Sequence, residues 1–255
     1  MLEIKITLHQ VNNQFSVNNV NLKVKAGTIF ALIGKSGSGK STVAKIISGE
    51  TICPTAQILL DGKELNTNYE RLIREFKEVG YVPQNLHLKP HHTTREFLEM
   101  LFQGKTEKEL RKMVNTFTKD FNLKPILDSK IQNLSGGERQ KLAIIQAISK
   151  PIKVLVLDEP FSQLDTLQKQ EIRQIVWSII KKLQIPCLMI SHDVLDVIQL
   201  SDEIGLMHQG NIIFKGNWKR FYQSKNAQII KIRNGITEFI NQTQKTIKHL
   251  NTVSK

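Results

Sequence analysis

A glycine-rich segment near the start of the chain has the residue types and spacing of a phosphate-binding loop. The run GKSGSGKS, residues 34–41, fits the pattern G-x-x-x-x-G-K-[ST]. In such a loop the backbone N–H groups point at phosphate oxygens, and the following helix adds the positive end of its dipole. The pattern predicts that Lys40 reaches the β- and γ-phosphates and that Ser41 ligates Mg²⁺. A flexible glycine turn without a ligand is the alternative, and the apolar run before the loop favours the nucleotide site.

Two adjacent carboxylates, Asp158 and Glu159, follow the apolar run 154–157. A run of this length predicts a central strand, which would present Asp158 where a metal ion bound by Ser41 could also be held. Glu159 could orient or deprotonate an attacking water. Acidic residues that merely end a strand are the alternative, and the glycine loop upstream favours the catalytic interpretation.

The segment LSGGERQ, residues 134–140, supplies a second group of backbone donors. Ser135 and Glu138 have the spacing of a capping box, and the two glycines at a helix start expose N–H groups to an anion. A helix cap without further function is the local alternative. However, LSGGERQ lies between the glycine loop and the segment DEP, residues 158–160, and resembles the signature of the ATP-binding cassette (ABC) ATPase family.

Three further segments resemble motifs of this family and occur in its order. YVPQ, which ends at Gln84, resembles the glutamine loop; FSQLD, which ends at Asp165, resembles the D-loop; and ISHD, with His192, resembles the switch-histidine segment. The resemblance covers roughly residues 1–225. Gln163 departs mildly from the family pattern, which usually has a small residue or Asn there.

The resemblance implies an ATPase with ATP as ligand and Mg²⁺ as cofactor, bound between two ABC subunits that we expect to form a homodimer. Glu159, His192 and Gln84 would be catalytic, and the metal would be held by Ser41, Gln84 and Asp158. The implied nucleotide-binding residues are Gly34, Lys35, Ser36, Gly37, Ser38, Gly39, Lys40, Ser41 and Thr42 of one subunit, with Ser135, Gly136 and Gly137 of the other and Asp165 linking the two sites.

The adenine partner is not fixed by the pattern. The family usually places an aromatic ring upstream of the glycine loop, and Phe15 is the best candidate. A core residue of a strand is the alternative for Phe15. His87, His91 and His92 could suggest a metal cluster, but their segment resembles the family's loop into its helical subdomain, so we expect solvated histidines.

The elements that must position these residues alternate between strand and helix, which predicts an α/β fold with a mostly parallel sheet. The resemblance specifies a P-loop NTPase core, an N-terminal antiparallel β subdomain and an inserted helical subdomain at about 86–134. Capping-box spacings at Thr93 with Glu96 and at Thr106 with Glu109 support the helical insertion. We therefore divide the chain into an ABC ATPase domain, residues 1–225, and a basic, helical tail, residues 226–255. Further predicted elements are strands at 29–33, 154–158 and 186–191, helices at 40–48, 135–149 and 167–183, and hairpins at Asp61-Gly62 and 207–212.

Composition and charge limit the class of protein. The 36 Lys and Arg against 23 Asp and Glu give a net charge of +13, which favours anionic partners without choosing among them. The two cysteines, Cys53 and Cys187, form no C-x-x-C pattern, so we expect a reducing compartment. No apolar run approaches the roughly 18 residues of a membrane span, and the start MLEIKITLHQ predicts no secretory signal.

A chain of this kind must pass its motion to other subunits if it drives transport. The resemblance implies transmembrane permease subunits as partners, with a solute-binding protein as a further candidate and a peripheral location on the cytoplasmic face of the membrane. DEPFSQLD most resembles importer ATPases, which favours uptake over export. A soluble, cytoplasmic ABC ATPase that acts on nucleic acid, ribosomes or iron–sulfur assembly is the alternative, and a non-hydrolysing binding module is disfavoured by Glu159 and His192.

Overall fold

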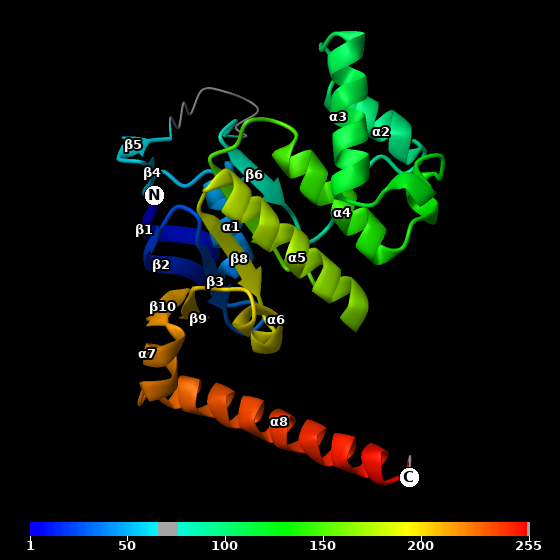
Figure 1. Cartoon of the computed structure of the whole chain (residues 1–255). Coiled ribbons are helices and arrows are strands. Elements are labelled where there is room, and N and C mark those ends of the chain that lie inside the picture. Colours follow the sequence, from blue (N-terminus) through cyan, green and yellow to red (C-terminus); the bar gives the residue numbers. More distant parts are fainter. Residues whose placement is uncertain (66–75, 254–255) are drawn as a thin grey trace.

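The computed structural model describes residues 1–65 and 76–253, and in this part of the chain ten strands form one mixed sheet (Figure 1). The strand order is β5-β4-β1-β2-β10-β9-β3-β8-β7-β6. In chain order the elements are β1 (Leu2–Asn12), β2 (Phe15–Val24), β3 (Ile29–Ile33), α1 (Lys40–Ser48), β4 (Ala56–Leu60), β5 (Lys63–Glu64), β6 (Val79–Val82), α2 (Thr94–Leu101), α3 (Glu107–Asp120), η1 (Lys124–Ile126), η2 (Ile131–Asn133), α4 (Gly136–Ile148), β7 (Val154–Asp158), α5 (Thr166–Leu183), β8 (Cys187–Ser191), α6 (Val194–Ile198), β9 (Glu203–His208), β10 (Asn211–Asn217), α7 (Trp218–Gln223) and α8 (Ala227–Val253).

The parallel half of the sheet contains β9, β3, β8, β7 and β6, and its ladders join β9 with β3, β3 with β8, β8 with β7 and β7 with β6. Every residue of β3, β7 and β8 is buried, as expected for strands covered by helices on both faces. Parallel strands end at the same edge of a sheet. The loop after β3, the carboxyl end of β7 and the residues after β8 therefore meet at one edge.

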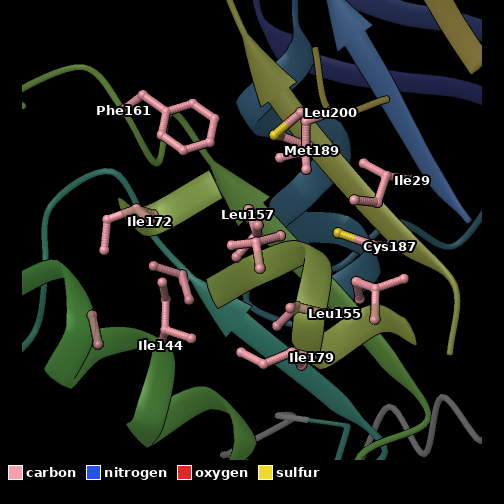
Figure 2. Packing of buried hydrophobic residues seen from close by; sticks show 14 of the residues in the cluster. Ile29, Ile144, Leu155, Leu157, Phe161, Ile172, Ile179, Cys187, Met189 and Leu200 are labelled. Atoms are coloured by element: carbon pink, nitrogen blue, oxygen red, sulfur yellow. The ribbon is translucent and has the colours of Figure 1, made fainter. Parts of the chain in front are cut away.

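Side chains of these strands alternate between two cores. Leu155, Leu157 and Met189 point to the face that α4 and α5 cover, where they pack with Ile144 and Ile172 (Figure 2). Val154, Val156, Leu188 and Ile190 point to the opposite face, where they pack with the residues of α1. Because both faces are apolar, the edge where the strands end is the place where polar side chains can gather.

The antiparallel half begins with the hairpin of β1 and β2, and β4 pairs with the other edge of β1. Apolar residues alternate with polar ones along β1, which places the side chains of Leu2, Ile4 and Ile6 in the core. Leu8 continues the alternation but is 48% exposed. The reason is that the pairing of β1 with β4 stops at Ile6, so no neighbouring strand on that side helps to cover the residues beyond it.

Both predicted hairpin turns are confirmed. Asp61 and Gly62 have φ of 50° and 77° between β4 and β5, and Gln209 and Gly210 have φ of 45° and 77° between β9 and β10. Left-handed pairs of this kind match the twist of a two-residue β-hairpin. The segment 66–75 lies outside the described residues.

Helices α2 and α3 lie together at one end of the molecule (Figure 1). Both begin with complete capping boxes: the Thr93 hydroxyl accepts from the backbone N–H of Glu96, and the Thr106 hydroxyl accepts from that of Glu109.

Helix α8 lies at the opposite end of the molecule from α2 and α3 and packs against α6 and α7. The short helices α6 and α7 were not predicted from the sequence. Within the described residues, no helix has the length and apolar character to cross a membrane.

Candidate functional site

The glycine loop connects β3 to α1 and closes on the side chain of Lys40. Its ammonium donates to the carbonyl oxygens of Gly34 at 2.8 Å and Lys35 at 3.0 Å. Lys40 is only 5% exposed. Burial lowers the pKa of Lys40, and the carboxylates of Glu159 and Asp158 act in the opposite direction. A cation is thus held at the base of the loop, where an anion would neutralise it.

The start of α1 leaves backbone donors available. Gly39 is the N-cap residue with φ of 103° and offers no side chain to cap the helix. Within the described part of the chain the first N–H groups of α1 have no side-chain partner, so they can bind phosphate oxygens. The buried hydroxyl of Ser38 is also without a hydrogen-bond partner among the described residues. A buried polar atom without a partner is costly, and a phosphate oxygen would satisfy it.

Close packing explains why the loop needs glycine at its ends. A Cβ on Gly34 would lie 2.3 Å from the carbonyl oxygen of Met207 in β9. A Cβ on Gly39 would lie 2.9 Å from side-chain carbons of Met207 and Val17, and 3.2 Å from the ring of Phe15. The loop is therefore held directly against β2 and β9.

Ser41 and Asp158 come together as predicted, although they are far apart in the sequence. The Ser41 hydroxyl donates to Asp158 Oδ1 at 3.0 Å. Burial raises the pKa of Asp158, and the hydrogen bond from Ser41 partly opposes that shift. A hydroxyl and a carboxylate are the oxygen ligands that Mg²⁺ prefers, so this pair fits the ion.

Glu159 and His192 form the second pair of the site. His192 Nδ1 lies 2.8 Å from Glu159 Oε2, and the side chains are 58% and 9% exposed respectively. Glu159 has a left-handed φ of 53°, and its N–H donates to the carbonyl of Ile190 in β8. This turn directs the carboxylate away from the strand and towards His192. The pair lies beside Asp158, at the edge where β7 and β8 end.

Gln84 follows β6 and is exposed. It lines a pocket together with Glu159 and Gln163. No hydrogen bond joins Gln84 to Ser41 or Asp158 in the described part of the chain. The structure therefore brings Gln84 near the carboxylate of Glu159 without bringing it onto the predicted metal pair.

The predicted signature residues stand apart from the glycine loop. Ser135 accepts from the N–H of Glu138 and caps α4, and Gly136 packs against the backbone of Gln163. Across residues 1–65 and 76–253, neither a hydrogen bond nor an ion pair links residues 135–137 to residues 34–42. Asp165 is exposed and caps α5 by accepting from the N–H of Gln168 at 2.9 Å.

Aromatic and histidine residues were the remaining candidates for the adenine contact and for a metal cluster. The half-buried ring of Phe15 lies next to Gly39, with its Cζ atom turned to the glycine loop. For the described residues, no group of three or more His, Cys, Asp and Glu side chains could hold a metal ion. Tyr81 begins the YVPQ segment; its buried hydroxyl lacks a hydrogen-bond partner among residues 1–65 and 76–253, and burial followed by the charge of Asp158 raises its pKa.

Comparisons with known proteins agree with the motifs. The family described as "ABC transporter" matches residues 17–162. A probable sulfate/thiosulfate import ATP-binding protein of Chlorella vulgaris is 31% identical over 220 residues, which are 84% of this chain and 92% of that protein. A zinc import ATP-binding protein of Rickettsia conorii is 32% identical over 206 residues, or 80% of this chain and 81% of that protein.

Among solved structures, an ATP-binding cassette in a dimeric post-hydrolysis state, bound to ADP and Pi, is 24% identical. The match covers 85% of this chain and 98% of that one, with a TM-score of 0.72. This likeness shows the fold and agrees with the α/β arrangement predicted from the sequence.

Proposed function

The chain belongs to the ABC transporter family and is an ATP-binding, ATP-hydrolysing subunit; from this premise we propose that it drives solute import through separate membrane subunits. The observation that carries the proposal is the meeting of Lys40, the Ser41–Asp158 pair and the Glu159–His192 pair at one edge of the sheet. A phosphate cradle, a metal pair and a paired carboxylate are the parts that ATP hydrolysis needs.

Binding of the triphosphate is assigned to residues 34–42. The N–H groups at the start of α1 and the Ser38 hydroxyl would bind phosphate oxygens, and Lys40 would exchange a carbonyl partner for a phosphate. Ser41 and Asp158 would hold Mg²⁺, with Gln84 as a further ligand once the loop after β6 moves. Bound there, Mg²⁺ would neutralise charge on the phosphates. Phe15 is the proposed contact of the adenine ring.

Glu159 is the proposed general base. It would take a proton from the water that attacks the terminal phosphorus, while the bond between that phosphorus and the oxygen of ADP breaks. His192 would hold the carboxylate in position through the 2.8 Å contact and would itself reach the terminal phosphate. Because a general base contributes roughly 10²- to 10⁴-fold, the loss of Glu159 would stop most turnover.

A second copy is proposed to complete the site. Residues 135–137 cap α4 away from the glycine loop of their own chain, so they are free to cover the nucleotide of a partner. Asp165 would then lie at the seam between the two copies. A solved ATP-binding cassette described as dimeric and bound to ADP and Pi supports the pairing of two copies. We propose a homodimer that ATP closes and hydrolysis opens.

The import direction rests on relatives. The proteins of Chlorella vulgaris and Rickettsia conorii are described as import ATP-binding proteins. By analogy we propose permease subunits as partners, a solute-binding protein as a further component, and a peripheral position on the cytoplasmic face of the membrane. The domain division at residues 225 and 226 also stays a prediction.

The transport proposal is tested by affinity purification of the tagged full chain from detergent-solubilised membranes of its own cell. We expect integral membrane proteins encoded near its gene to co-purify and to stimulate ATP hydrolysis. A Lys40→Met variant serves as the control, because it would retain the membrane partners and lose the stimulation. Recovery with ribosomes or nucleic acid, and without membrane proteins, would contradict the import proposal and favour the soluble alternative.

A further inference from the structure

The buried carboxylate of Asp196 has no part in the site described above. It lies in α6, the five-residue helix that begins directly after His192 and Asp193. Its side chain is 7% exposed and is the acceptor of two cations from α5. Lys169 Nζ lies 2.9 Å from both carboxylate oxygens, and Arg173 Nη2 lies 3.0 Å from Oδ1.

Arg173 also reaches the segment that carries Glu159. Its guanidinium lies over the ring of Phe161, at 5.5 Å from the ring centre, and Phe161 is 1% exposed. Phe161 is two residues beyond Glu159, and Asp196 is four residues beyond His192. A single side chain of α5 thus contacts both of the chain segments that bring Glu159 and His192 together.

On its other side α6 faces α8 across an open pocket. Figure 1 shows α6 between α5 and α8. The pocket between them has a volume of about 290 Å³ and is lined by residues that include His192, Leu195, Ile232 and Gly235. Val197 of α6 is fully buried in the core, so the ionic contact of Asp196 with α5 acts together with this apolar contact to position the helix.

We propose that Asp196, held by Lys169 and Arg173, is a positioning residue that keeps His192 against Glu159. Lys169 and Arg173 are one helical turn apart and repel each other, so the carboxylate is needed to hold both. Breaking the contact would let the start of α6 shift, and with it the imidazole. The proposal rests on the function assigned to Glu159 and His192, but the geometry that it describes can be measured without ATP.

The test compares Asp196→Asn with a matched control, Glu171→Gln. Glu171 also lies on α5 and also pairs with a buried lysine, Lys141 at 2.6 Å, but that pair joins α5 to α4 instead of α6. The full chain, free of nucleotide, is labelled with ¹⁵N at its imidazoles. The His192 signals are assigned by their loss in His192→Gln.

We expect the His192 signals to move in Asp196→Asn, to return towards the original position in Asp196→Glu, and to stay unchanged in Glu171→Gln. In ATPase assays Asp196→Asn should lower kcat about 10- to 100-fold, because small misplacements of catalytic groups have effects of this size. The KM for ATP should change less than about twofold, since the glycine loop is untouched.

Unmoved His192 signals in a folded Asp196→Asn protein would overturn the proposal, as would equal shifts in Glu171→Gln. Should Asp196→Asn fail to fold, Lys169→Gln carries the test, because it leaves Asp196 paired with Arg173 and is therefore the milder change. The His192 signals should then move less than in Asp196→Asn, and unmoved signals would overturn the proposal. Signals that move as expected in a protein that never hydrolyses ATP would support the positioning role and contradict the proposed function.

Discussion

Replacing Gly39 by Ala should destabilise the chain through two separable effects. The first is backbone strain, because an L-residue with a positive φ such as 103° is disfavoured by about 1–2 kcal/mol. The second is packing, since the new Cβ would lie 2.9 Å from Val17 Cγ2 and from Met207 Cε. Overpacking of a core contact typically costs about 1–3 kcal/mol. Together they predict a loss of about 2–5 kcal/mol in the free energy of unfolding.

Gly37→Ala is the matched control for this prediction. Gly37 has a φ of 76°, but no atom of the residues that the structure describes lies within 4 Å of a Cβ at that position. Both substitutions reduce the entropy of the unfolded chain alike, by about 0.4–1 kcal/mol, so this effect cancels between them. Urea denaturation without nucleotide should therefore give a difference of about 1–3 kcal/mol, which is the packing contribution alone. A difference below about 0.5 kcal/mol would refute the reasoning that the start of α1 is wedged against β2 and β9.

Two further predictions concern the charged groups of the site. Lys40→Met removes the cation of the loop and should weaken ATP binding about 10- to 100-fold, because a hydrogen bond from a charged group contributes about 1.5–3 kcal/mol. Calorimetry measures this affinity, and an unchanged value would contradict the role of residues 34–42 as the phosphate-binding loop. Burial raises the pKa of Asp158 in the folded chain above 3.8, its usual value in the unfolded chain. The contribution of Asp158 to the free energy of unfolding is therefore fully present below pH 3.8 and is lost as the pH rises through the pKa of the folded state. Asp158→Asn should therefore flatten the dependence of the melting temperature on pH above about 4 in the absence of Mg²⁺, and a profile identical to that of the parent would contradict the assignment.

Much of the fold was predictable because the local signals agree with the global arrangement. The apolar run at 29–33 is followed by glycines and then by a helical pattern, so strand, loop and α1 were each indicated by residues within the segment itself. The capping boxes at Thr93 and Thr106 are likewise local, since each hydroxyl lies three residues from its acid. The meeting of Ser41 with Asp158 followed from the rule that parallel strands end at one edge.

The features that the sequence did not predict depend on contacts between distant segments. Helix α6 is only five residues long, and its ionic contact with α5 spans 27 residues from Lys169 to Asp196. Neither residue belongs to a motif, and a charged side chain in a helical pattern usually indicates a solvated surface. The exposure of Leu8 also depends on where β4 stops, which the alternation in β1 does not encode.

For Gln84, the role implied by the sequence motif and the position in the single chain differ. The resemblance implies that Gln84 binds the metal, whereas the structure places it beside Glu159 and Gln163. Residues 135–137 and Asp165 likewise act as helix caps within one chain, and their proposed roles depend on ligands and on a second copy. Sequence motifs can identify such residues before the geometry of a single chain does.

The central claim is that ATP is bound between two copies of the chain, each of which contributes a different surface. The most direct test is the mass of the Glu159→Gln variant in solution, because this variant should bind ATP and Mg²⁺ without hydrolysing the nucleotide. Light scattering should give the 29.2 kDa of one chain without nucleotide and twice that mass with ATP and Mg²⁺. A mass that stays at one chain while ATP is bound would contradict the account.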